Sequence, residues 1–206
     1  MEIISYRHLM TSTLVIILAS SFTIHSSQPK QVSYQVEFIR TSCSSTTYPR
    51  LCFNSLVKHA YLIQSNRVLL TGTALNVTLA SAKSTSAVIS TLSKSRGLKP
   101  REVAAMSDCV EELSDTVDEL RRSIDEMSHL RTSNFELTMS DVQTWVSAAL
   151  TDESTCTDGF QETAARALDN NNNNGDIKTV VRGKIVQLAQ LTSNALALIN
   201  QLASHG

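Results

Sequence analysis

The stretch PREVAAMSDCVEELSDTVDELRRSIDEMSHLR, residues 100–131, decides the fold of this chain. Its apolar residues recur in alternating steps of three and four: Val103, Met106, Val110, Leu113, Val117, Leu120, Ile124 and Met127. This is the a/d spacing of a long helix that packs along its whole length. Pro100 suits the first helical turn, and Glu102 suits the positive end of the helix dipole. A helix about 45 Å long cannot bury this stripe alone, so the stretch predicts partner helices of similar length.

Three further segments, residues 67–96, 139–168 and 176–203, show helical spacing. Their apolar positions are, in that order, Leu75, Leu79, Ala82, Ile89 and Leu92; Val142, Trp145, Ala149, Cys156, Phe160 and Ala164; and Val181, Ile185, Leu188, Leu191, Ala195, Leu198 and Leu202. Gly97 predicts the end of the first segment, Ser140 predicts the N-cap of the second, and Trp145 is expected to anchor the core. Short polar loops separate the helices, at residues 132–134 and 170–175. The pattern predicts an all-α, antiparallel up-down-up-down four-helix bundle.

The region before the bundle predicts a helical hairpin. Residues 31–40 fit either a short helix or an extended arm, whereas FNSLVKHAYLI, residues 53–63, has helical spacing. Between them, TSCSSTTYPRLC contains the Thr, Ser and Pro that mark a turn. We therefore expect an N-terminal hairpin over residues 28–65 and the bundle over residues 66–206.

Residues 1–27, MEIISYRHLMTSTLVIILASSFTIHSS, have the pattern of a secretory signal peptide. Arg7 and His8 precede an apolar run over residues 9–24, and the small residues at its end offer a cleavage site. A membrane anchor is the alternative, but the run is short and is interrupted by Thr and Ser. We expect a secreted mature chain that begins near Gln28 and has no contact with a membrane.

The four cysteines are Cys43, Cys52, Cys109 and Cys156, and in an oxidising compartment an even number predicts disulfides. Zinc is the alternative, but no pair has C-x-x-C spacing. Of the three possible connectivities, one agrees with the expected turns. Cys43 and Cys52 flank the turn of the hairpin, while Cys109 and Cys156 lie equally far from the loop at residues 132–134, as facing residues of an antiparallel helix pair do. Closing these loops would contribute roughly 2.6 and about 4 kcal/mol.

The sequence holds no pattern typical of an active site. His59, His129 and His205 are the histidines after residue 27, and none lies in a G-x-S-x-G or H-E-x-x-H context. No phosphate loop occurs, and the carboxylates are expected on exposed helix faces rather than in catalytic pairs. The net charge of −1 gives no bulk attraction to nucleic acid. We therefore expect no catalysis, no cofactor, no metal and no nucleic-acid partner.

Charge is distributed unevenly along the chain. Residues 67–96 carry four basic side chains and no acid, whereas residues 100–131 carry nine carboxylates and four arginines. Residues 136–168 are again acidic, with six carboxylates and one arginine. A rigid secreted bundle with one acidic flank suggests docking to a basic surface of another protein. The alternative is that the charges only keep the helices soluble.

The single N-glycosylation sequon of the chain is Asn76-Val77-Thr78. It lies in the middle of an expected helix, where sequons are often unused. The sequence therefore marks Asn76 as a glycosylation site and leaves its occupancy open.

Three stretches carry a family resemblance: Cys43-x8-Cys52 with Tyr48-Pro49 before the second cysteine, SDCVEELSDTVDEL at residues 107–120, and DVQTWVSAALTDESTCTDGF at residues 141–160. Together they resemble the plant invertase and pectin methylesterase inhibitor family, in the right order and over essentially the whole mature chain. The second and third stretches are similar to the pectin methylesterase branch. The Pro-Lys-Phe segment of many invertase inhibitors is absent.

The resemblance implies a four-helix bundle with a helical hairpin, and disulfides that join the first cysteine to the second and the third to the fourth. It also implies an inhibitor domain over residues 28–206, secreted to the plant cell wall, or apoplast. Such a protein binds pectin methylesterase one-to-one and covers its substrate cleft, without chemistry of its own. Inhibition of a cell-wall or vacuolar invertase is the alternative within the family, and a structural or carbohydrate-binding wall protein is the alternative outside it.

Inhibitors of this family contact the enzyme through the middle helices of the bundle. The matching positions here are Glu111, Asp115, Asp118, Thr155 and Asp158. The three acids follow 3–4 spacing and so lie on one helix face, and the other two residues flank Cys156. Asp152 and Glu153 depart from the family's sparser pattern because they add charge near the same region.

Overall fold

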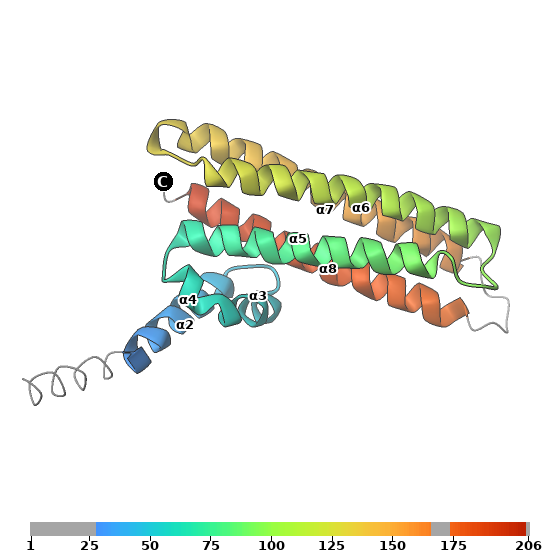
Figure 1. The fold of residues 1–206 in the computed structure, drawn as a ribbon, viewed down its shortest axis with the longest axis horizontal. Helices are drawn as coiled ribbons and strands as arrows, with labels where there is room; N and C mark the ends of the chain where they lie inside the picture. The colour runs from blue at the N-terminus through green and yellow to red at the C-terminus, as the bar shows by residue number, and fades with distance from the viewer. Residues whose placement is uncertain (1–27, 166–173, 205–206) are drawn as a thin grey trace, which may run out of the picture.

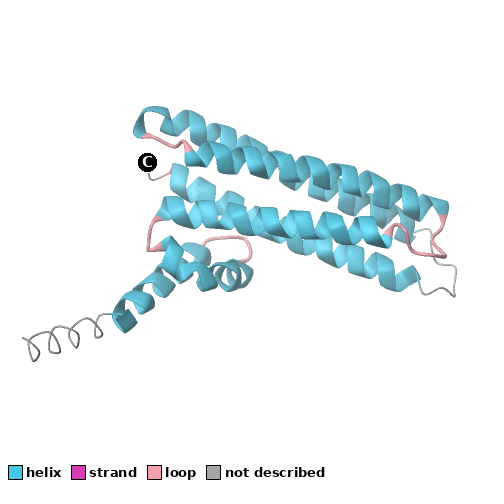
Figure 2. Cartoon of the chain, viewed as in Figure 1, coloured by secondary structure: helices cyan, strands magenta, loops and turns pink. Residues whose placement is uncertain are grey.

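The computed structural model describes residues 28–165 and 174–204, and over these residues the secondary structure is helical (Figure 1, Figure 2). The predicted all-α class is confirmed. The helices, in chain order, are α2 (Gln28–Ser44), α3 (Pro49–Leu56), the 3-10 turn η2 (Val57–His59), α4 (Ala60–Ile63), α5 (Arg67–Leu92), α6 (Pro100–Ser128), the 3-10 turn η3 (Thr132–Asn134), α7 (Phe135–Ala165) and α8 (Asn174–Ala203). The expected signal peptide and most of the expected asparagine loop lie outside the described residues.

The four long helices α5, α6, α7 and α8 pack side by side, and successive helices run in opposite directions in Figure 1. Each contacts two others along its length: α6 lies between α5 and α7, and α8 closes the ring against α5 and α7. Within the described residues, no helix combines the length and apolar character needed to cross a membrane. Because each of the four helices packs against two others, the core lies along the axis that they share.

The apolar stripe of α6 faces this core. Its buried members are Met106, Leu113, Val117, Leu120 and Met127, while Val110 and Ile124 are half-buried. The prediction was wrong for Val103, whose side chain is 39% exposed. Glu102 is buried beside it instead, because Lys178 of α8 neutralises its charge, with Nζ 2.9 Å from Oε1. The stripe is thus apolar in the middle of α6 and ionic at its first turn.

Helix α7 contributes Met139, Val142, Val146, Ala149 and Cys156 to the core. Trp145 was expected to anchor that core and is only half-buried, because the neighbouring Val146 faces inward at that turn. The side chains of Phe160 and Ala164 lie outside the part of the chain that the structure describes. In α8 all seven predicted core residues are buried.

Two predicted helix ends were wrong. α5 ends at Leu92 rather than at residue 96, and Gly97 lies beyond it in the loop with a φ of +85°. α7 begins at Phe135 rather than at residue 139, so Ser140 lies inside the helix and does not cap it. The loop closes immediately before Phe135, where the Arg131 N–H donates to Oδ1 of Asn134 at 2.7 Å.

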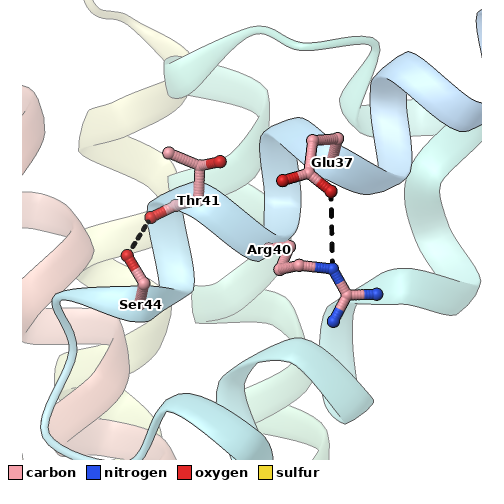
Figure 3. Close-up of polar contacts among 4 residues, drawn as sticks. All are labelled: Glu37, Arg40, Thr41 and Ser44. Atoms are coloured by element: carbon pink, nitrogen blue, oxygen red, sulfur yellow. Dashed lines mark hydrogen bonds and ion pairs between the residues drawn. The ribbon is translucent and has the colours of Figure 1, made fainter.

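The hairpin consists of α2, α3 and α4 and packs beside α5 and α8 (Figure 1). Residues 31–40 are helical, which settles the alternative left open by the sequence. Cys43 at the end of α2 is bonded to Cys52 in α3, with Cα atoms 5.6 Å apart. On α2, Arg40 pairs with Glu37 (Figure 3), and its guanidinium also lies 4.3 Å from the ring centroid of Phe53 in α3. The Ser44 hydroxyl donates to the Thr41 carbonyl at 2.7 Å, which completes the last turn of α2 (Figure 3).

Candidate partner-binding site

Helices α6 and α7 form the most closely joined pair of the bundle. Cys109 is bonded to Cys156 with Cα atoms 4.6 Å apart, and the two side chains are almost fully buried. Further along the pair, the buried hydroxyl of Thr116 donates to the carbonyl of Ala149 at 3.5 Å. The disulfides in the structure are the pairs that the turn positions and the family resemblance indicated. The Cys109–Cys156 disulfide fixes the relative register of the two acidic helices α6 and α7.

A groove of about 740 Å³ runs beside the second disulfide. Its polar lining residues are Arg101, Asp108, Glu111 and Glu112 from α6, and Thr155 and Asp158 from α7. Four of these six side chains are carboxylates, and the two cysteines line the same groove. The groove is therefore a negatively charged channel across a rigid helix pair, suited to a cationic group of a partner.

The five residues expected to bind a partner divide into two places. Glu111, Thr155 and Asp158 meet at the groove. Asp115 and Asp118 are exposed further along α6 and do not line it. Because the spacing from Glu111 to Asp118 follows successive turns, the groove and these two acids form one continuous acidic strip on α6. We call Glu111, Asp115, Asp118, Thr155 and Asp158 the acidic face.

Two members of the acidic face already have a partner within the chain. Asp118 Oδ1 lies 2.6 Å from Nη1 of Arg121 on the next turn of α6, and both side chains are more than half exposed. The Thr155 hydroxyl donates to the Thr151 carbonyl at 3.0 Å, one turn earlier on α7. Neither contact removes the residue from solvent, so both remain accessible to another protein.

Behind the acidic face, α6 turns a second row of acids toward α7. Glu112, Glu119 and Glu126 are spaced by seven residues, and the Thr138 hydroxyl of α7 donates to Oε1 of Glu126 at 3.3 Å. Burial, and then the charges of Asp152, Asp115, Glu111 and Asp108, raise the pKa of Glu112. The sequence analysis missed this row, although its heptad spacing could have revealed it.

Glu119 and Asp152 meet across the α6–α7 contact. Burial raises the pKa of Glu119 to about 7, and the charge of Asp152 and its hydrogen bond act in the same direction. The charge of Asp115 adds to this effect, and only Arg122 opposes it. Burial also raises the pKa of Asp152, although the hydrogen bond from Glu119 acts in the opposite sense. Burial and the charge that each group places beside the other therefore disfavour the ionisation of both carboxyls together.

Glu153 does not add surface charge, contrary to the expectation from the sequence. Its side chain is fully buried between α7 and α8, with Oε1 2.7 Å from the Thr192 hydroxyl. Burial raises the pKa of Glu153 to about 8, against the effect of the Thr192 hydrogen bond. Asp152 is half-buried, so neither residue is a freely exposed acid of the acidic face.

The sequence pattern of the family described as plant invertase/pectin methylesterase inhibitor matches residues 37–198. The chain belongs to this family. The match spans the hairpin turn, both disulfides and most of the bundle, so it covers every residue of the acidic face.

Two similar proteins match this chain over nearly their whole length. A "21 kDa protein" of Daucus carota is 43% identical over 98% of this chain and 97% of its own. "Pectinesterase inhibitor 11" of Arabidopsis thaliana is 42% identical over 93% of this chain and 95% of its own. A crystal structure of a mutant pectin methylesterase inhibitor from Arabidopsis has a TM-score of 0.59 at 23% identity, over 77% of this chain and 92% of that one. This last likeness shows the shared fold.

The remaining expected sites lie apart from the acidic face. Asn76 is exposed on α5, and its Nδ2 donates to the Gly72 carbonyl at 2.8 Å. Thr78, the third residue of the sequon, is buried and donates to the Ala74 carbonyl at 2.9 Å. Over the described ranges, no three His, Cys, Asp or Glu side chains are arranged to hold a metal ion.

Proposed function

We propose that this protein inhibits pectin methylesterase by docking its acidic face beside the enzyme's substrate cleft. Membership of an inhibitor family makes the chain a binding protein rather than an enzyme. The similar Arabidopsis thaliana proteins bear the name pectinesterase inhibitor, which favours this target over invertase. The observation that carries the surface assignment is the strip of exposed carboxylates on a disulfide-joined helix pair.

The rigidity of α6 and α7 is what suits them to inhibition. A disulfide, a buried hydroxyl contact and a continuous apolar core hold the two helices in one register. A pre-organised surface loses little conformational entropy on binding, so more of the interaction energy contributes to affinity. Asp115 and Glu111 would then meet basic side chains at the rim of the cleft, which excludes methylated pectin from the catalytic centre by steric occupation.

Complementary charge should speed the association and make it sensitive to ionic strength. Most of the exposed carboxylates lie on α6 and α7, whereas α5 carries the exposed Arg67 and Lys83 and no acid. This asymmetry orients the inhibitor as it approaches a basic rim. We expect one inhibitor to bind one esterase, because residues 28–165 and 174–204 present one acidic face.

The proposal extends to processing and location. Residues 1–27 would direct secretion and be removed, leaving an inhibitor domain over residues 28–206 in the cell wall. Asn76 would carry the N-glycan on α5, a helix that contributes no residue to the acidic face. Mass spectrometry of the protein purified from plant tissue tests both the new N-terminus and the glycan.

A methanol-release assay tests the function directly. Purified mature protein is titrated against several plant pectin methylesterases and, in parallel, against cell-wall and vacuolar invertases. We expect stoichiometric inhibition of at least one esterase, weakened as salt is added. Inhibition of invertase alone would replace the target, and binding to pectin without any esterase would indicate a wall-structural protein.

The double variant Asp115→Lys/Asp118→Lys tests the surface. It should raise the inhibition constant at least about tenfold, since two charges reverse at the docking face. Ser84→Lys/Ala87→Lys is the control, because it adds positive charge at exposed positions of α5. Helix content by circular dichroism should match the wild type in both variants. Equal inhibition by all three proteins would reject the acidic face as the docking surface.

A further inference from the structure

Three carboxyl groups in the middle of the bundle have an oxygen that neither solvent nor a hydrogen-bond donor reaches. These oxygens are Oε2 of Glu119, Oδ2 of Asp152 and Oε2 of Glu153. Glu119 lies on α6 and the other two on α7, so the groups cluster where the helices meet. An ionised carboxylate enclosed in this way loses its hydration without compensation, which costs several kcal/mol per charge. A neutral carboxyl avoids most of that cost.

The hydrogen bonds of Glu153 fit a protonated acid. The Thr192 Oγ1 lies 2.7 Å from Oε1 of Glu153 and 3.2 Å from the Leu188 carbonyl oxygen. Thr192 has one hydroxyl hydrogen and can serve only one of these acceptors at a time. A protonated Glu153 donates its own hydrogen to Thr192, and Thr192 can then donate to Leu188. This arrangement gives a partner to Oε1 of Glu153, to the Thr192 hydroxyl and to the Leu188 carbonyl, and it joins α7 to α8 through a chain of hydrogen bonds.

Glu119 and Asp152 need a proton for a different reason. Each has a buried oxygen without a partner, and the two carboxyls interact across the α6–α7 contact, where a hydrogen bond can form only if one of them holds a hydrogen. The charges around the pair come from α6 and α7. Asp115 on α6 and the neighbouring carboxyls disfavour ionisation, and Arg122 favours it. α8 contributes the uncharged Thr192 nearby, and the charged side chains of α5, Arg67 and Lys83, are exposed to solvent.

We propose that the bundle folds with protons on Glu153 and on the Glu119–Asp152 pair, so that its stability falls as the medium changes from acidic to mildly basic. The folded chain is then most stable at mildly acidic pH, and its α6–α7–α8 packing is less stable above neutrality. This property belongs to the isolated chain and does not depend on which enzyme, if any, the acidic face binds.

The sign of the effect follows from proton linkage. In the unfolded chain the glutamates ionise near 4.5, whereas the folded pKa is about 7 for Glu119 and about 8 for Glu153. Between these values the folded state holds protons that the unfolded state has released, so stability decreases with rising pH. The decrease begins near pH 4.5 and ends near pH 8, above which both states are ionised.

Thermal unfolding of the purified disulfide-bonded protein at a series of pH values tests the proposal. We expect the Tm to fall by about 10 °C between pH 5 and pH 8. In a domain of this size such a shift corresponds to a loss of a few kcal/mol of unfolding free energy. Glu153→Gln and Glu119→Gln replace an acid by a neutral side chain of the same shape. Each should flatten the pH dependence and should raise the Tm at pH 8 relative to the wild type.

Asp125→Asn is the matched control, because it removes one exposed carboxylate from α6 and should leave the slope unchanged. The infrared spectrum of the wild type at pH 6 supplies a second measurement, in which a neutral carboxylic C=O band should be present. If Glu153→Gln fails to fold, this band and Glu119→Gln decide the matter. A wild-type Tm that is level or rises from pH 5 to pH 8, or a spectrum without the band, overturns the proposal.

Discussion

The side-chain amide of Asn194 on α8 forms two hydrogen bonds with the backbone of Tyr48 in the hairpin turn. Its Oδ1 accepts from the Tyr48 N–H at 2.9 Å, and its Nδ2 donates to the Tyr48 carbonyl at 3.0 Å. Asn194 is 3% exposed, so these bonds are shielded from water. Tyr48 immediately precedes α3, and its carbonyl also receives the Cys52 N–H. The amide therefore acts as a clamp between the hairpin and the bundle.

Asn194→Ala should release this clamp. The Tyr48 N–H loses its partner and the Tyr48 carbonyl keeps only the Cys52 N–H, so we expect a loss of about 2 kcal/mol of unfolding free energy. Hydrogen exchange should speed up in α2 and α3 more than in α6 and α7. Gln187→Ala is the control, because Gln187 is exposed on the same helix. Uniform faster exchange over the whole chain would contradict a local role.

Lys178→Met should remove the ion pair between Lys178 and Glu102 at the first turn of α6. The variant leaves the buried Glu102 carboxylate with the Lys99 N–H, 3.0 Å from Oε2, as a backbone donor. We expect a loss of about 2 kcal/mol at pH 7, measured by urea unfolding. Lys184→Met, on the exposed side of α8, should have little effect.

The same variant should respond to acid in a defined direction. Burial alone would raise the pKa of Glu102, but the hydrogen bonds from Lys178 and the Lys99 N–H, with the two ammonium charges, hold that pKa below its usual 4.5. The stabilisation is thus fully present above pH 4.5 and is lost as the pH falls through the folded value. The difference between wild type and Lys178→Met should shrink at pH 3. An equal difference at pH 7 and pH 3 would show that the lysine acts by packing alone.

The fold was largely predictable because each long helix carries its own apolar stripe. The ends of the helices were less predictable, because they depend on local hydrogen bonds. Gly97 indicated an end at residue 96, yet α5 ends at Leu92, where i to i+3 hydrogen bonds replace the α-helical pattern. The Ser93 hydroxyl donates to the Ser90 carbonyl at 2.9 Å, and the Ser95 N–H donates to the Leu92 carbonyl at 3.0 Å. One of these i to i+3 bonds is made by a serine side chain and the other by the backbone, and apolar periodicity detects neither.

For the candidate site, the sequence predicts which residues share one face of a helix but not which residues meet between helices. The spacing of Glu111, Asp115 and Asp118 indicated a shared exposed face, and the structure leaves all three exposed. Glu153 looked like one more acid of that region. Its burial depends on Thr192, which is 39 residues further along the chain and on another helix. Pairings of this kind come from the packing of helices and not from the spacing within one.

Removing each disulfide should destabilise the protein to a different extent. Cys109 and Cys156 are separated by 47 residues, and Cys43 and Cys52 by 9. In the loop-entropy description, Cys109→Ala/Cys156→Ala loses about 4 kcal/mol and Cys43→Ala/Cys52→Ala about 2.6 kcal/mol. Urea unfolding of the two double variants measures this order. A larger loss for the short loop would mean that the hairpin disulfide acts through native packing instead.

The last prediction separates two neighbouring acids of the acidic face. Asp118 already faces Arg121 at 2.6 Å, so part of its charge is compensated within α6. Within the described part of the chain Asp115 forms no ion pair, and its exposed carboxylate is available to a partner. We therefore expect Asp115→Asn to raise the inhibition constant more than Asp118→Asn does, by roughly tenfold against two- to threefold.

Arg121→Ala provides the complementary measurement. It frees the Asp118 carboxylate and removes a positive charge from the strip, so inhibition should strengthen slightly at low salt and return to the wild-type value at high salt. Helix content should be unchanged, because the lost pair is exposed and contributes little to stability. If Asp118→Asn instead raises the inhibition constant more than Asp115→Asn does, then Arg121 itself belongs to the docking surface. The esterase would in that case bind the Asp118–Arg121 ion pair rather than an isolated carboxylate.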